Sequence, residues 1–311
     1  MEKIATREAY GKALVKLGAQ NPQVVVLDAD LSKSTKTNNF QKVYPERFFN
    51  MGIAEQNMIG TAAGFAIAGK IPFASTFAVF ATGRAFEQIR NSIAYSRLNV
   101  KIAATHAGLT VGEDGASHQA ILDISLMRSL PDMTVLVPCD GVEAEQAVFA
   151  AAAMDGPVYI RLGRSAVPIL HAGGDRFAIG KGEELRQGAD VSLLACGIMV
   201  AEALKAAEEL EAEGVSARVL NIASIKPLDV ETIVKAARET GAIVTAEEHS
   251  IIGGLGSAVA EVLAEHCPVP MERVGIKDVF GESGKPQELL DKYGLTAKDI
   301  KAAAYRVIKK K

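Results

Sequence analysis

The strongest constraint on the fold of this 311-residue chain is the alternation of short apolar runs with longer segments of helical periodicity. Short apolar runs bounded by turn residues are typical of buried strands in a parallel sheet, and helices usually connect such strands. The alternation therefore predicts an α/β fold with right-handed crossovers. In the first part of the chain, the expected strands are 24–31, 101–109, 133–140 and 157–163, and the expected helices are 6–20, 54–69, 82–97, 116–130 and 141–154.

The alternation pauses over residues 168–190, where glycine and charged residues are frequent, and a second set follows. A chain of this length has about two domains as a starting expectation. We therefore expect a first domain over 1–170, a linker over 171–189 and a smaller α/β domain over 190–311. In that second domain the expected strands are 191–197, 216–222 and 242–249, and the expected helices are 199–214, 230–241 and 256–266.

Composition narrows the class of protein. A net charge of −3 gives no reason to expect nucleic acid or an anionic membrane as a partner. No apolar run approaches the ~20 residues of a membrane span, and the amino terminus does not resemble a secretory signal, so we expect a cytoplasmic protein. Cys139, Cys196 and Cys267 are odd in number and lie in apolar surroundings, which favours reduced thiols over disulfides or metal ligands.

Glu55 is a single carboxylate at the start of an apolar helical segment, IGTAAGFAIAG. One interpretation is a solvated acid stabilised by the helix dipole, worth ~0.3–1 kcal/mol. The other is an acid held in a dry site, where burial can make it a proton donor near neutral pH. Periodicity alone does not choose between them.

A glycine-rich loop, THAGLTVGEDGASHQ, follows one predicted strand and carries His106, Asp114 and His118. Loops at the carboxyl ends of parallel strands project side chains into ligand clefts. Asp114 with its glycine could instead form only a turn, and Ser117 could cap the next helix. The spacing matches no common metal-ligand pattern, so we expect no metal here and favour binding of substrate hydroxyls.

Several other residues could bind an anion or line a site. Arginine binds phosphate through its planar fork, although a single arginine is more often a solvated surface residue. Phe77 and Phe80 would by default belong to the core. The phosphate-binding candidates are Arg7, Ser34, Arg161 and Arg164.

Taken together, these segments resemble the carboxyl-terminal half of transketolase, from about residue 3 to the end and most densely over 24–165. The resemblance rests, in the family's order, on ATREAYGKAL, LDADLSKS, MGIAEQNMIGTAAGFA, PFASTFAVFATGRAFEQIR, THAGLTVGEDGASHQ and PCDGVEAEQAV. It implies a pyrimidine-binding domain, a parallel sheet with helices on both faces, followed by a transketolase C-terminal-type α/β domain.

The resemblance assigns Glu55 to the glutamate that bonds N1′ of the aminopyrimidine ring of thiamine diphosphate. A proton shared there favours the imino tautomer, which can remove the thiazolium C2 proton, and apolar neighbours would keep the site dry. Phe80 corresponds to the ring that stacks on the aminopyrimidine, with Phe77 and Ile53 beside it. Asp30 corresponds to an acid near the cofactor at the subunit boundary.

The resemblance also implies a channel for a sugar phosphate. We expect Glu55 and His118 to be catalytic. Gly83 stands where many relatives carry a tyrosine beside the pyrimidine, so the packing there should differ. The residues expected to line the channel are His106, Asp114 and His118, and those expected to bind the acceptor phosphate are Arg7, Ser34 and Arg164.

The chain contains no G-D-G motif, which in the family holds the Mg²⁺ of the cofactor's diphosphate. We therefore expect one subunit of a split transketolase of the pentose phosphate pathway. Its partner would be an amino-terminal subunit that carries the diphosphate-binding domain and most of the Mg²⁺ contacts, in an α2β2 complex.

Two alternatives stay open. The β subunit of a 2-oxoacid dehydrogenase shares the two-domain plan, although GEDGASHQ and the pair Arg7 and Arg164 favour a sugar-phosphate channel. A non-catalytic scaffold partner would also retain the fold, but the presence of Glu55 and the channel residues argues against it.

Overall fold

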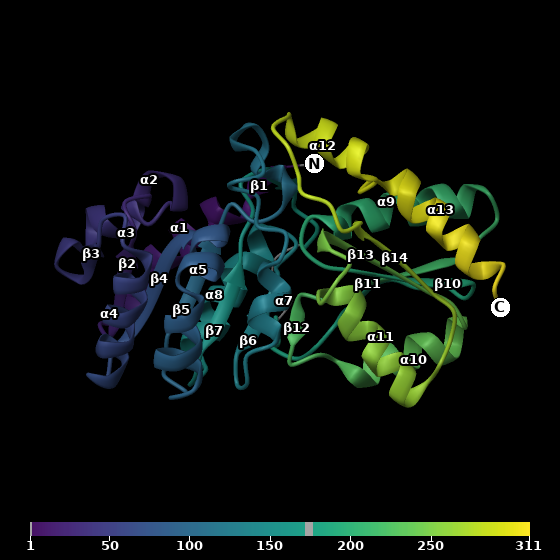
Figure 1. Ribbon diagram of the computed structural model, residues 1–311. Helices are drawn as coiled ribbons and strands as arrows, with labels where there is room; N and C mark the ends of the chain where they lie inside the picture. Colours follow the sequence, from purple (N-terminus) through teal and green to yellow (C-terminus); the bar gives the residue numbers. More distant parts are fainter. Residues whose placement is uncertain (1, 172–176) are drawn as a thin grey trace.

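The computed structural model describes residues 2–171 and 177–311, which form two main β-sheets with helices packed around each (Figure 1). In Figure 1 the amino-terminal unit lies on the left and the carboxyl-terminal unit on the right. A short antiparallel pair, β1 (Lys3–Ala5) with β8 (Ala166–Pro168), joins the start of the chain to the end of the first unit. The predicted α/β class with two units is confirmed.

Among the described residues, the first sheet has seven strands in the order β12-β6-β7-β5-β4-β2-β3. All pairs are parallel except β12 with β6, and β12 comes from the second half of the chain. The sequence prediction missed β4, because its polar Ser75 and Thr76 interrupt the apolar run. The strands are β2 (Val24–Asp28), β3 (Phe48–Asn50), β4 (Ile71–Phe77), β5 (Lys101–Thr105), β6 (Thr134–Leu136), β7 (Val158–Arg161) and β12 (Ser224–Lys226).

Helices cover both faces of this sheet. On one face α1 (Thr6–Gln20) packs on α8 (Gly141–Ala153), and their apolar side chains share a core with Phe73. On the other face lie α4 (Glu55–Ile67), α5 (Ala78–Arg84) and α7 (Asp123–Arg128). The shorter helical segments are α2 (Ser32–Thr35), α3 (Asn38–Val43), η1 (Pro45–Arg47), α6 (Phe86–Gln88), η2 (Ile89–Ala94) and η3 (Leu109–Asp114).

The second sheet has the strand order β14-β13-β10-β11-β9 and is parallel except for β9. Helices α9 and α13 pack together on one face, and α10 packs on α11 on the other. The elements are β9 (Glu183–Arg186), β10 (Val191–Ala195), α9 (Met199–Ala212), β11 (Ala217–Asn221), α10 (Val230–Thr240), β13 (Ile243–Ser250), α11 (Leu255–His266), β14 (Met271–Ile276), α12 (Pro286–Tyr293) and α13 (Ala297–Ile308).

The two units share one apolar core. Met127 and Val135 of the first unit belong to the same buried cluster as Ile225 and Val259 of the second. Because β12 also extends the first sheet, the second unit contributes both a strand and core side chains to the first. The units are therefore packed together, with no solvated gap between their cores.

Two predicted segments differ in the structure. The helix expected over 116–130 is reduced to α7, because Gly112 and Gly115 adopt positive φ and turn the chain; Ser117 consequently caps no helix. The predicted linker 171–189 includes β9, while residues 172–176 lie outside the described residues. Within the described residues, no helix is both long enough and apolar enough to cross a membrane.

Candidate active site

Glu55 is the first residue of α4, and its side chain is buried although it starts a helix. The residue is 4% exposed, so the solvated interpretation from sequence is wrong. Its Oε1 accepts a hydrogen bond of 2.9 Å from Nη1 of Arg84, the last residue of α5. A carboxylate with so little solvent depends on such partners, because desolvation otherwise disfavours its charge.

Arg84 also covers an aromatic ring. Its guanidinium carbon lies 4.0 Å from the centroid of the Phe80 ring, within the range of a cation–π contact. Phe80 lies one helical turn before Arg84 on α5, which places both side chains on the same side of the helix. The sequence did not reveal this contact, because only the three-dimensional placement of α4 beside α5 brings Glu55 to Arg84.

Phe77 and Phe80 form an aromatic cluster with two histidines. The Phe77 and Phe80 rings are stacked at a centroid distance of 5.7 Å, and His106 stacks on Phe77 at 3.8 Å. His118 meets the edge of Phe80 at 5.3 Å. The structure thus brings together residues that the resemblance assigned to the pyrimidine site and to the sugar channel.

His106 is a buried, neutral histidine. Burial, followed by the positive charges of Arg7 and Arg164, lowers the pKa of His106 to about 3. Nη1 of Arg7 donates to its Nε2 at 3.1 Å, so the partners assign the ring proton to Nδ1, which donates to Oγ1 of Thr105 at 2.9 Å. His106 can therefore accept or donate hydrogen bonds but does not exchange protons near neutral pH.

The predicted phosphate residues lie around this histidine. Arg7 donates to the backbone oxygen of Ser34 at 3.0 Å, and the charge of Arg164 contributes to lowering the pKa of Arg7, after burial. Arg164 pairs with the exposed Glu113 at 3.1 Å. Two guanidinium groups that influence one histidine create a positive region suited to an anion.

Arg161 is not available for phosphate binding, contrary to one candidate assignment from sequence. Its side chain is 6% exposed and pairs with the fully buried Asp123 at 2.7 Å. Its Nη2 also donates to the backbone oxygen of Glu248 in the second unit at 2.9 Å. Arg161 therefore belongs to a buried ion pair of the first unit and is also hydrogen-bonded to the second unit.

The remaining candidates lie near the surface. Asp114 is exposed at the end of η3, and Nδ1 of His118 lies 2.9 Å from Oγ of Ser117. Asp30 has a left-handed backbone and pairs its side chain with that of Asn50 at 3.1 Å.

Ile53 is 78% exposed and so lies outside the buried part of the aromatic cluster. A Cβ added at Gly83 would meet nothing within 4 Å.

The second unit supports the loop that carries Asp114 and His118. Oε1 of Glu248 accepts a 2.5 Å hydrogen bond from the backbone N–H of Thr110. Gly108 has φ +82°, and a Cβ there would lie 2.2 Å from Cδ of Glu248. Gln119 donates to the backbone oxygen of Glu282 at 2.9 Å. The sequence could not reveal this role of Glu248, because these contacts join segments more than a hundred residues apart.

The fold and site define a two-unit α/β protein with a buried helix-start acid next to an aromatic and histidine cluster. Residues 2–169 match the family of the transketolase pyrimidine binding domain, and residues 180–300 match that of the transketolase C-terminal domain. This chain belongs to the transketolase family. The alternative of a 2-oxoacid dehydrogenase subunit is not favoured by these matches.

Relatives of similar length support this membership. The chain is 64% identical to a solved structure described as "Split gene transketolase, inactive beta4 tetramer", with a TM-score of 0.94 and 99% of both chains covered. It is 51% identical to a protein of Methanocaldococcus jannaschii named as a transketolase C-terminal section, over 98% of this chain and 96% of that one. It is 47% identical to the 6-deoxy-6-sulfo-D-fructose transketolase subunit SqwH of Clostridium sp. (strain MSTE9), over 98% of this chain and 95% of that protein.

Proposed function

We propose that this chain is the carboxyl-terminal subunit of a split, thiamine diphosphate-dependent transketolase that transfers a two-carbon ketol unit between sugar phosphates. The observation that carries the proposal is the buried Glu55, whose partner Arg84 lies over the ring of Phe80. Family membership supports the reaction class, and the name of the Clostridium relative indicates that subunits of this type also serve sulfo-sugars.

The residues present fit the aminopyrimidine end of the cofactor. The planar guanidinium of Arg84 lies on the Phe80 ring and donates a hydrogen bond to Glu55. This contact supports the proposal that Phe80 and Glu55 together can hold a flat, nitrogen-rich group. An aminopyrimidine has the same combination of a flat face and N–H or ring nitrogen groups. When bound, thiamine diphosphate supplies the carbanion chemistry, and the protein supplies position and proton control.

This chain's own residues then have separate tasks. Glu55 holds a proton against the pyrimidine N1′, shielded from water by the apolar face of α4. Phe80, with Phe77 behind it, holds the ring in place, and Ile53 and Asp30 would complete the cofactor site at the boundary with the partner. His118, at the edge of Phe80, is placed to exchange a proton with the substrate.

The sugar phosphate would lie on the other side of the aromatic cluster. Arg7 and Arg164, together with Ser34, would bind its phosphate, because their charges already converge on His106. The neutral His106 and the exposed Asp114 would hydrogen-bond sugar hydroxyls. Because these residues recognise phosphate and hydroxyl groups, they do not by themselves select one donor or acceptor sugar.

The diphosphate and Mg²⁺ require a second polypeptide in this proposal. The chain has no G-D-G motif, and its candidate metal-ligand groups, among the described residues, involve His171 and lie apart from Glu55. A relative described as an inactive β4 tetramer is consistent with a subunit that is inactive without its partner. We propose an α2β2 complex in the cytoplasm, operating in the pentose phosphate pathway.

The test is reconstitution with a partner subunit of about 270–300 residues that carries G-D-G, a length expected for one such domain. The pair, with thiamine diphosphate and Mg²⁺, should convert xylulose 5-phosphate plus ribose 5-phosphate, while this chain alone should not. Turnover by this chain alone would overturn the split-subunit proposal. Reduction of an electron acceptor with a 2-oxoacid, without ketol transfer, would instead favour the dehydrogenase alternative.

A further inference from the structure

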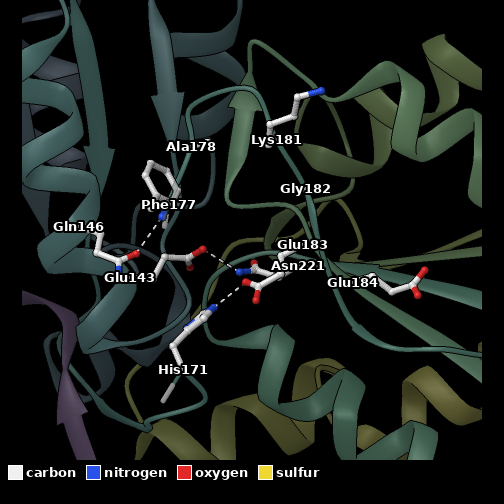
Figure 2. A pocket seen from close by; sticks show the side chains of 10 residues that line it. All are labelled: Glu143, Gln146, His171, Phe177, Ala178, Lys181, Gly182, Glu183, Glu184 and Asn221. Carbon is white, nitrogen blue, oxygen red and sulfur yellow. Dashed lines mark hydrogen bonds and ion pairs between the residues drawn. The ribbon is translucent and has the colours of Figure 1, made fainter. Parts of the chain in front are cut away.

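A polar cavity of about 390 Å³ lies between the amino-terminal end of α8 and the edge of the second sheet. Figure 2 shows the side chains of Glu143, His171, Glu183 and Asn221 converging from different segments. None of these residues belongs to the candidate active site. The cavity is therefore a separate feature whose polar lining needs its own explanation.

His171 is oriented by one carboxylate and presents its second nitrogen to another. Its Nδ1 lies 2.8 Å from Oδ2 of Asp140, which also accepts from the backbone N–H groups of Leu170 and His171. Its Nε2 lies 2.8 Å from Oε2 of Glu183 (Figure 2). A histidine held by a carboxylate at one nitrogen while the other faces further ligands is the arrangement common in protein metal sites.

A second, independent observation comes from Asn221, which is 1% exposed and lines the cavity. Its Nδ2 donates to Oε1 of Glu143 at 2.7 Å, while its Oδ1 has no hydrogen-bond partner. The carboxylate partner fixes the orientation of the amide, because Glu143 needs a donor there. A buried amide oxygen without a partner destabilises the folded protein, and a cation in the cavity would supply that partner.

We propose that Glu143, His171 and Glu183 bind a zinc ion in this cavity, with Oδ1 of Asn221 facing it. One ligand atom from each of the three residues lies within 4.8 Å of the others. One imidazole nitrogen with two carboxylate oxygens is a donor set that zinc accepts, and water can complete four-coordination. Ligand atoms in such a site lie about 3.3 Å apart, whereas Nε2 of His171 and Oε2 of Glu183 are 2.8 Å apart, so binding of the ion would replace their hydrogen bond. Glu183, at 43% side-chain exposure, has room to move away from the ring and admit the ion.

The neighbouring group of Cys139, Asp140 and His171 is the weaker alternative. It would require Nδ1 of His171, which already pairs with Asp140 at 2.8 Å. The zinc ion therefore belongs on the Nε2 side. There it joins α8, the segment that carries His171, and β9, and so ties the first unit to the edge of the second sheet.

The proposal is tested with the purified full-length chain, stripped of metal by a chelator and then titrated with ZnCl₂ by calorimetry. We expect one equivalent of Zn²⁺ to bind and to raise the melting temperature. Glu183→Gln should weaken the affinity at least about tenfold with the fold intact, and His171→Gln should abolish it. Co²⁺ in place of Zn²⁺ should give visible absorption bands that the His171 variant lacks.

His266→Gln is the matched control, because His266 lies 3.8 Å from Glu265 on the exposed surface and offers no third ligand in the described residues. That variant should bind zinc like the parent chain. Should the parent take up no stoichiometric zinc, or should the Glu183 and His171 variants bind as tightly as the parent, the site does not exist. Neither result bears on ketol transfer, so this proposal and the proposed function fail independently.

Discussion

At the scale of single residues, the placement of Glu55 is the most informative feature of the molecule. A carboxylate at a helix start ordinarily faces water, where the helix dipole stabilises its charge. Here it is buried, and Arg84 is its partner while also lying on Phe80. Glu55 and Phe80 therefore contact the same guanidinium, one through its buried carboxyl group and the other through its aromatic ring.

Replacing Glu55 by Gln keeps the shape of the side chain but removes the group that holds the proton. In the reconstituted complex, we expect ketol transfer to fall by about 10²–10⁴-fold, the range for loss of a general acid–base group. Assembly, measured by size-exclusion chromatography, should be unchanged.

Glu87→Gln is the control for that experiment, because Glu87 is an exposed acid in α6 whose side chain, within the described part of the chain, accepts hydrogen bonds from Gln88 and Asn91 alone. It should retain full turnover. An active Glu55→Gln complex would contradict the role given to Glu55 and would revive the scaffold interpretation.

At the scale of elements, the loop from His106 to His118 depends on the second unit for its shape. Gly108 has positive φ and lies against the carboxylate of Glu248, whose oxygen receives the N–H of Thr110. No side chain fits at Gly108 without displacing Glu248. The C-terminal unit therefore holds the loop that carries the proposed sugar contacts.

Gly108→Ala should accordingly displace the loop and lower the free energy of unfolding by about 1–3 kcal/mol, through backbone strain and the clash with Glu248. We expect KM for the sugar phosphate to rise more than the affinity for thiamine diphosphate falls. Urea denaturation and steady-state kinetics of the reconstituted complex measure both effects.

Gly60→Ala provides the comparison, since Gly60 lies in α4 and a Cβ there meets nothing within 4 Å. It should be neutral or slightly stabilising, because alanine favours a helix by about 1 kcal/mol over glycine. Equal loss of stability in both variants would mean that the contact with Glu248 is unimportant.

At the scale of the whole molecule, a buried ion pair of the first unit is hydrogen-bonded to the second unit. Arg161 pairs with Asp123 within the first unit and donates to the backbone of Glu248 in the second. The two charges of this pair compensate each other, and hydrogen bonds from Tyr159 to Asp123 and from Arg161 to Glu248 support them. Removal of one partner leaves an uncompensated buried charge, which is costly.

Arg161→Met should therefore destabilise the chain by about 3–5 kcal/mol in urea denaturation. Arg97→Met, which breaks the exposed pair with Asp132, should cost less than about 1 kcal/mol. Adding Asp123→Asn to the Arg161 variant should recover part of the loss, since the remaining buried charge disappears. Similar costs for Arg161→Met and Arg97→Met would refute a buried, structural role for Arg161.

The raised pKa of Glu248 predicts how the free energy of unfolding of the whole chain depends on pH. Burial raises the pKa of Glu248 to about 7 from its ordinary value of 4.5. At a pH between 4.5 and about 7, Glu248 keeps its proton in the folded protein but has released it in the unfolded chain. Raising the pH through this window should therefore lower the contribution of Glu248 to the free energy of unfolding, by on the order of 3 kcal/mol in total.

Urea denaturation at pH 5, 6, 7 and 8 checks this prediction. Glu248→Gln, which cannot ionise, should show a smaller decline between pH 5 and 8 than the parent chain. Glu208→Gln, at an exposed position on α9, should decline like the parent. A parent and a Glu248→Gln variant with parallel pH profiles would show that Glu248 does not titrate in this range.

Much of the fold could be predicted from the sequence, because burial imposes a repeating apolar pattern on strands and helices. That pattern located α1, α8 and most strands of both sheets. It missed β4, whose polar residues are buried, and it extended α7 too far, because glycines with positive φ turn the chain there. Local pattern carries no information on such long-range burial.

The candidate site, like the fold, could be predicted only in part from the sequence. The motifs indicated Glu55, Phe80, His106 and His118 as candidate site residues. This was possible because the functional group of each residue is known from the sequence. The sequence could not reveal that Arg84 pairs with Glu55, that Arg161 is buried, or that Glu248 holds the sugar loop. Those contacts join segments that are far apart in the sequence, and only the packing of helices and units in the tertiary structure determines them.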